Sequence, residues 1–144
     1  MHKPEEASKI ATVIGLVFDG IGMFGMLAVA AAVNVAEVFT VDLFLDEGLT
    51  QSEAELMVDI LDVLGVVFFV AGGIFLIVFM VNIVLFTKLI NGRFNAEKAS
   101  KTYLYQIVWG AINLLFNQIS GIAHLISGIK GRSTKLQSNR FEEE

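Results

Sequence analysis

Basic residues are absent from a continuous stretch that covers more than half of this 144-residue chain. No lysine or arginine occurs between Lys9 and Lys88. A charge at the centre of a bilayer costs about 2.5–3.5 kcal/mol, so an uncharged apolar run of about 20 residues is typical of a membrane-spanning helix. Two runs meet this description: residues 10–33, interrupted only by Asp19, and residues 63–87, which carry no charge.

A third stretch, residues 102–130, carries no Lys, Arg, Asp or Glu before Lys130. As one helix it would be about 42 Å long, more than the roughly 30 Å of hydrocarbon requires. As a hairpin, each arm would be only about 21 Å long, which is short unless the arms include flanking residues or the bilayer thins. The length of this stretch therefore leaves both possibilities open.

The placement of charges predicts how the chain is oriented. Lys3 and Lys9 precede the first run, and four bases surround Gly92 after the second. The segment between the runs, residues 34–62, contains no base but eight acids: Glu37, Asp42, Asp46, Glu47, Glu53, Glu55, Asp59 and Asp62. Because cytoplasmic loops are enriched in Lys and Arg, we expect a cytoplasmic N-terminus and an acidic outer segment. The bases after residue 129 also favour the cytoplasm, which requires an even number of crossings and therefore a hairpin.

A polar stripe in the third stretch favours the opposite interpretation. Polar or small residues recur there at alternating steps of four and three: Gln106, Gly110, Asn113, Asn117, Ser120, His124, Ser127 and Gly131. One uninterrupted helix would keep such a stripe on one face. The sequence thus predicts an all-α polytopic transmembrane bundle, with two long helices plus either a C-terminal hairpin (four segments) or one long helix (three segments).

Local signals predict the ends of the elements. Thr50-Gln51-Ser52-Glu53 is a capping-box pattern, so we expect a helix from there to Ile90, stopped by Asn91-Gly92. Residues 1–132 are predicted to form a single membrane domain, followed by a polar, disordered cytoplasmic tail at 133–144. Two lysines ahead of an apolar run also fit a secretory signal, but Asp19 and the length of the run favour a retained span.

Asp19 is the strongest candidate for a functional residue, because ionisable groups within a span face the protein interior and mark proton or ion paths. Helix geometry places Asp19 about 14 Å and Asn82 about 9 Å from the cytoplasmic ends of their spans. In a hairpin, His124 would also lie about 9 Å deep. We therefore hypothesise a buried cluster of Asp19, Asn82, His124 and Asn113, with Gln106 nearby, that binds or relays a proton. The sequence itself favours the simpler interpretation, a set of structural interhelical hydrogen bonds worth about 0.6 kcal/mol each, because it offers only one Asp and one His.

Two further features suggest surfaces of interaction. Small residues on one face of the first span predict close helix packing: Gly15, Gly22, Gly25 and Ala28. The outer acids, notably Asp42, Asp46 and Glu47, could attract a cationic peptide or form an ordinary solvated face. Tyr103, Tyr105 and Trp109 are predicted to belong to an aromatic belt at the membrane surface.

Composition excludes several classes of function. A net charge of −5 argues against nucleic acid as a partner, and the absence of cysteine excludes disulfides, thiolate catalysis and zinc–sulfur sites. No enzyme, metal or cofactor motif occurs. The leading hypothesis is a non-enzymatic accessory protein that packs against itself or a larger complex in the bilayer. The alternatives are an oligomer that conducts protons or cations through Asp19 and the polar stripe, and an immunity or sensing protein that binds a cationic peptide.

The arrangement resembles a family of uncharacterised small four-helix membrane proteins of Gram-positive bacteria, known as a domain of unknown function. The resemblance rests on EEASKIATVIGLVFDGIG at the first span, on the acidic segment and on NQISGIAHLISGIKGR at the end. It covers most of residues 8–132. Ile119-Ser120-Gly121 stands where the family tends to have a proline. The resemblance implies a bacterial plasma membrane and carries over no activity and no functional residue.

Overall fold

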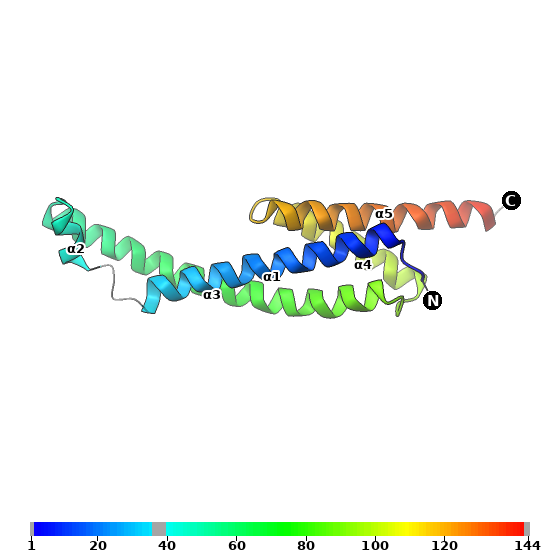
Figure 1. The fold of residues 1–144 in the computed structure, drawn as a ribbon, viewed down its shortest axis with the longest axis horizontal. Helices are drawn as coiled ribbons and strands as arrows, with labels where there is room; N and C mark the ends of the chain where they lie inside the picture. Colours follow the sequence, from blue (N-terminus) through cyan, green and yellow to red (C-terminus); the bar gives the residue numbers. More distant parts are fainter. Residues whose placement is uncertain (1, 36–39, 143–144) are drawn as a thin grey trace. The chain divides into compact units, whose positions relative to one another are not determined.

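The computed structural model describes the backbone of residues 2–35 and 40–142 and the side chains of residues 2–33 and 40–133, so Glu37 lies outside the described part. All regular secondary structure in these ranges is helical, which confirms the all-α fold class. Figure 1 shows five helices: α1 (Glu6–Val35), α2 (Val41–Asp46), α3 (Gln51–Ile90), α4 (Ala96–Asn113) and α5 (Gln118–Glu142). The predicted spans 10–33 and 63–87 fall within α1 and α3.

Both ends of α3 lie where the sequence predicted them. At its start, the Thr50 backbone N–H and hydroxyl donate to the Glu53 carboxylate at 2.9 and 2.6 Å. At its end, Gly92 adopts a left-handed conformation with φ +66°. The Gly92 N–H then bonds to Leu89 O and the Arg93 N–H to Lys88 O, both at 3.0 Å, which is a Schellman motif that closes the helix.

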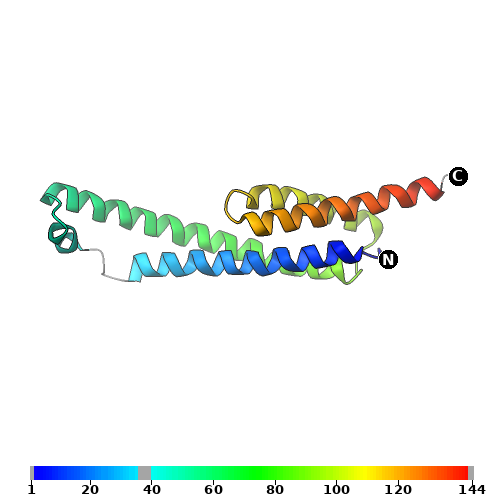
Figure 2. The same ribbon diagram turned by 45° about the horizontal axis from the view of Figure 1, so that its top comes forward.

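The third uncharged stretch forms a helical hairpin. Helix α4 ends at Asn113 and α5 begins at Gln118, and the two helices lie side by side in both views (Figures 1 and 2). Asn117 fixes the turn, because its Oδ1 accepts the Ser120 N–H at 3.2 Å and so caps the first turn of α5. The stripe therefore does not indicate a continuous helix, and this interpretation was wrong.

The hairpin arms are longer than the uncharged residues alone allow. Helix α4 begins at Ala96, six residues before the uncharged stretch, and its 18 residues extend about 27 Å. Asn95 caps this start by accepting the Lys98 N–H at 2.8 Å. Helix α5 continues to Glu142, into the segment that the sequence analysis describes as a polar tail.

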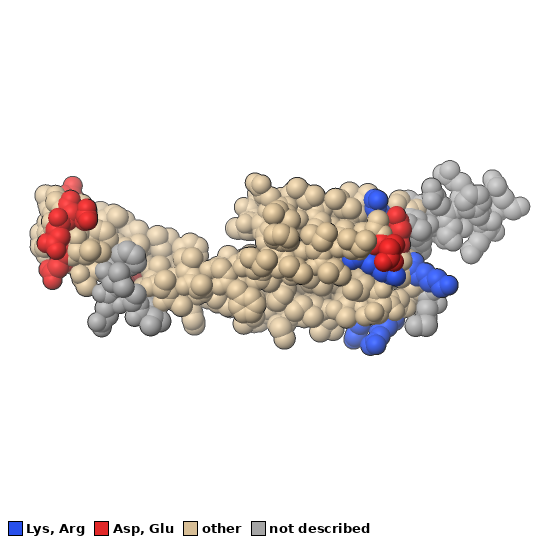
Figure 3. Space-filling model, in the orientation of Figure 1, with Lys and Arg blue, Asp and Glu red and all other residues tan. Residues whose placement is uncertain are grey.

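The chain divides into two compact units. The first contains Met1–Gly22 and Val78–Glu144, that is, the first part of α1, the end of α3, and the hairpin. The second contains Met23–Ile77, where close packing is seen at Gly72: a Cβ there would lie 2.8 Å from Leu27 Cδ2. Charge differs between them, since the described charged residues of the second unit are all acidic, and the bases lie on the first (Figure 3).

Interior and exterior of the described chain have unusual compositions. Large apolar side chains of α1 and α3 are widely exposed, for example Ile21 at 60% and Phe69 at 64%. The first unit instead buries a set of polar side chains: Ser8, Thr12, Asp19, Asn82, Thr102, Gln106, Asn113, Ser120, His124 and Ser127. Two helices of the described chain are long and apolar enough to cross a membrane by length and composition, α1 over Glu6–Val33 and α3, and only 28% and 11% of their most apolar windows are buried.

Candidate functional site

The site is built on a polar face of α1 that packs against the hairpin. Ser8, Thr12, Gly15 and Asp19 recur at steps of four, three and four, so they share one face of the helix, and all four are buried. Ser8 contacts Ser127, and Asp19 contacts Ser120, so α5 runs antiparallel to α1. The six polar stripe residues of both hairpin arms all bond to α1, which explains why they are polar although a turn separates them. The stripe glycines Gly110 and Gly131 pack within the hairpin instead.

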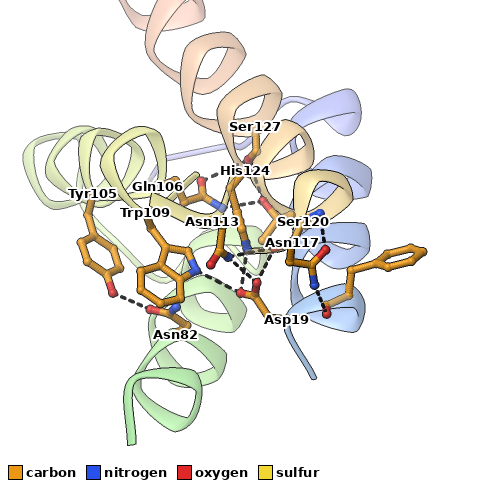
Figure 4. A network of polar contacts seen from close by, with 12 residues as sticks. Asp19, Asn82, Tyr105, Gln106, Trp109, Asn113, Asn117, Ser120, His124 and Ser127 are labelled. Atoms are coloured by element: carbon orange, nitrogen blue, oxygen red, sulfur yellow. Dashed lines mark hydrogen bonds and ion pairs between the residues drawn. The ribbon is translucent and has the colours of Figure 1, made fainter. Parts of the chain in front are cut away.

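Asp19 is the centre of the network in Figure 4 and is only 8% exposed. Its Oδ2 accepts from Trp109 Nε1 and is paired with His124 Nε2, both at 3.0 Å. Its Oδ1 accepts from Asn113 Nδ2 at 2.6 Å and from the Ser120 hydroxyl. Asn113 Nδ2 also donates to the Ser120 hydroxyl at 3.0 Å, so the α4 and α5 donors support one another.

This arrangement matches a carboxylate, because each oxygen of Asp19 lies beside two donor groups and an ionised carboxyl only accepts hydrogen bonds. Nε2 of His124 must then carry a hydrogen that it donates to Asp19. In a neutral imidazole the other nitrogen, Nδ1, has no hydrogen and offers a lone pair. That Nδ1 is buried and has no hydrogen-bond partner among the described residues.

Helix contacts hold the His124 ring in place. A Cβ on Gly15 would lie 2.6–2.8 Å from Cε1, Nε2 and Nδ1 of the ring, so only a glycine fits at this position of α1. On another side, the Phe86 ring of α3 lies 5.1 Å from the ring, centroid to centroid. Gly110 of α4 likewise allows close approach, because its Cβ would lie 3.1 Å from His124 Cβ. The side chain is fully buried.

Asn82, the fourth member of the predicted cluster, lies next to the network but does not share its hydrogen bonds. Its Oδ1 accepts from the Tyr105 hydroxyl at 2.7 Å (Figure 4). Its Nδ2 is buried and lacks a partner among the described residues. The structure therefore brings together Asp19, His124 and Asn113 as hypothesised, and connects Asn82 to α4 instead.

A second group of polar side chains, the hydroxyl cluster, consists of Ser8, Thr12, Gln106 and Ser127. The Ser127 hydroxyl lies 3.0 Å from that of Ser8 and 2.7 Å from that of Thr12. Gln106 closes the cluster, because its Nε2 donates to Thr12 Oγ1 and its Oε1 accepts from Ser127 Oγ, both at 3.1 Å. All four side chains are fully buried. The sequence analysis missed Ser8 and Thr12, although their spacing from Asp19 marks the same helix face.

Two aromatic residues do not lie where an aromatic belt would place them. Trp109 is 9% exposed and donates to Asp19, and Tyr103 is 1% exposed and packs where a Cβ on Gly131 would collide with its ring. The belt prediction was therefore wrong for both. Tyr105 is partly buried and bonded to Asn82.

The predicted packing face of α1 is only partly used. Gly15 contacts His124, and a Cβ on Gly22 would lie 2.9 Å from Nδ2 of Asn117, which donates to Phe18 O at 2.6 Å. In contrast, a Cβ on Gly25 would meet nothing within 4 Å, and Ala28 is exposed, so these two positions of the predicted face do not pack within the described chain.

The outer acids Asp42, Asp46 and Glu47 lie on α2 and its C-terminal cap, and all three are exposed. Across the described residues, no group of three or more His, Asp or Glu side chains could hold a metal ion. Comparison of the chain with protein-family models, with curated proteins and with solved structures gave no match. The resemblance to the Gram-positive membrane family therefore stays a prediction.

Proposed function

We propose that this chain is a multi-pass integral membrane protein that acts as a non-enzymatic, proton-responsive accessory protein of the plasma membrane. Support for a bilayer comes from the distribution of side chains, since the exposed surface is rich in Ile, Val and Phe while the interior holds Asp, His, Asn and Ser. Soluble proteins rarely expose large contiguous apolar patches, whereas polar groups of spanning helices face the interior of a bundle.

In the proposed topology, α1 and α3 are spans and the hairpin supplies two further crossings. The bases Lys3, Lys88 and Arg93 support a cytoplasmic N-terminus, and the acids of α2 support an outer position for residues 34–62. Four crossings return the C-terminal end of α5 to the cytoplasm, as Lys130 and Arg132 favour.

A proton is the ligand that the site supports best, and the carrying observation is the buried Asp19–His124 pair with an unpartnered Nδ1. With a neutral ring the pair has a net charge of −1, which is costly in a medium of low dielectric constant. A proton on Nδ1 makes the ring positive and the pair neutral overall. Because the pair joins α1 to α5, its charge state changes the packing of the hairpin against α1.

The accessory role follows from what the chain leaves uncovered. Gly25 and Ala28 form an open small-residue face on α1, and faces of this kind permit close helix contact in membranes. A conducting role has less support, because the buried polar side chains all belong to the first unit, while the described buried hydrophobic residues of the second include Met23, Ala30 and Ala54. The peptide-binding alternative rests on exposed acids alone.

The test uses the single tryptophan as a reporter. Trp109 shares Oδ2 of Asp19 with His124, so a charge on the ring changes the field at the indole. We expect Trp109 emission in lipid nanodiscs to show a transition as the pH is lowered, because a proton on the ring adds a charge beside the indole. The transition should vanish in His124→Gln and persist in His2→Gln, which removes the only other histidine. An unchanged transition in His124→Gln, or no transition in the wild type, would contradict the proposal.

A further inference from the structure

The hydroxyl cluster lies between the Asp19–His124 pair and the N-terminal end of α1. At that end, Tyr103 Oη lies 3.2 Å from Nε2 of His2, which is only partly buried. Tyr103 precedes Gln106 of the hydroxyl cluster by one turn of α4, and Ser8 of that cluster contacts Ser127 at 3.0 Å. Polar groups therefore follow one another from a partly exposed histidine to the interior of the first unit.

The orientation of the His124 ring points its free nitrogen away from Asp19. Cε1 is the ring atom nearest to the Cβ position of Gly15. On one side of Cε1, Nε2 pairs with Asp19, which follows Gly15 by one turn of α1. Nδ1 lies on the other side of Cε1. The hydroxyl cluster is one helical turn away on both helices, because Thr12 precedes Gly15 by three residues and Ser127 follows His124 by three.

We infer that the proton reaches His124 Nδ1 from the N-terminal face, through Tyr103 and the hydroxyl cluster, with a water molecule completing the last step. This inference rests on the proposed function and names the path to its site. Each hydroxyl accepts a proton on its oxygen and passes its own hydrogen onward, so the cluster ends unchanged. The proton comes from bulk water and ends on the Nδ1 lone pair, where the Asp19 carboxylate balances the new charge.

Few other ionisable groups face this path. Next to the ring these are Asp19 on α1 and Tyr105 on α4, since the α3 side chains Asn82 and Phe86 do not titrate. At the entrance the ionisable groups are His2 and Tyr103, with Glu5 acting on the Tyr103 hydroxyl from the residue before α1.

Thr12 provides a matched pair of variants that separates the path from the packing. Thr12→Val keeps the shape and removes the hydroxyl, whereas Thr12→Ser keeps the hydroxyl and removes a methyl group. After a pH jump in nanodiscs, Trp109 emission should relax about tenfold more slowly in Thr12→Val, because a transfer barrier rises when a hydrogen-bonded step is lost. Thr12→Ser should relax at the wild-type rate, and the midpoint of the titration should stay the same in both variants.

Ser127→Ala gives a second, independent measurement, with Ser133→Ala as its control on the exposed part of α5. We expect slow relaxation only in Ser127→Ala. Wild-type rates in Thr12→Val and Ser127→Ala, with the pH transition intact, would overturn the path and leave the proton site standing. Equally slow Thr12→Ser and Thr12→Val would attribute the effect to packing and also overturn it. Loss of the transition in the wild type would remove the site itself.

Discussion

Gly15→Ala should loosen the contact between α1 and the hairpin. The new Cβ would lie 2.6–2.8 Å from three atoms of the His124 ring. Nonbonded carbon atoms prefer about 3.5–4.0 Å, so the ring must withdraw by about 1 Å. The Nε2–Oδ2 distance to Asp19 is 3.0 Å, and such a shift takes it beyond hydrogen-bonding range.

The size of the effect follows from two opposing terms. Overpacking a tight interior costs about 1–3 kcal/mol. Replacing glycine by alanine in a helix returns about 0.5–1 kcal/mol. We therefore expect Gly15→Ala to lower the free energy of unfolding by about 1–2 kcal/mol. Gly25→Ala is the matched control, because a Cβ there meets nothing within 4 Å.

The assay is unfolding by sodium dodecyl sulfate in mixed micelles, followed by Trp109 emission, since the chain has one tryptophan. The Gly15→Ala transition should move to lower detergent fraction and the Gly25→Ala transition should not. Equal stability of the two variants would refute the packing of His124 against Gly15.

Three further changes test other contacts. Asp19→Asn should lower the free energy of unfolding by about 1–3 kcal/mol in the same micelles, because the single oxygen of the amide cannot accept from all four donors. A loss of about 0.6 kcal/mol or less, which is the average for one interhelical hydrogen bond, would argue against a central role of Asp19. The double variant Asn82→Leu, Tyr105→Phe should lose less free energy of unfolding than either single variant, since removing both partners of the hydrogen bond leaves no unpaired group. A loss in the double variant equal to the sum of the two single losses would contradict this. Hydrogen bonds from Thr50 hold the pKa of Glu53 below its ordinary value, so the capping box stabilises α3 at pH above that ordinary value. This stabilisation is lost as the pH falls through the lowered pKa, so the amide protection factors of the first turn, which are corrected for the intrinsic exchange rate, should fall there; pH-independent protection factors would oppose this.

The charge pattern and local motifs predicted the long helices well. Capping residues and Gly92 act over a few positions, so both ends of α3 could be derived from neighbouring residues. The hairpin was harder, because Asn117 is at once a stripe residue and the cap of α5. The stripe keeps its phase through the turn because both arms face α1.

The site was partly predictable. Asp19 and His124 were identified because ionisable groups in apolar stretches are rare. The contact of Trp109 with Asp19 joins residues 90 positions apart, and no local period reports such a pair. Ser8 and Thr12 could have been found, since their steps of four and three match those used to define the stripe in the last stretch.

The most direct test of the account asks whether lipid covers the exposed apolar surface. The chain has no cysteine, so single-cysteine variants can be labelled in intact cells with a membrane-impermeant maleimide. Ile21 is 60% exposed, and Asp46 on α2 is also exposed. We predict rapid labelling of Asp46→Cys from outside and none of Ile21→Cys until detergent is added. Labelling of Ile21→Cys as fast as Asp46→Cys in intact cells would contradict the membrane arrangement.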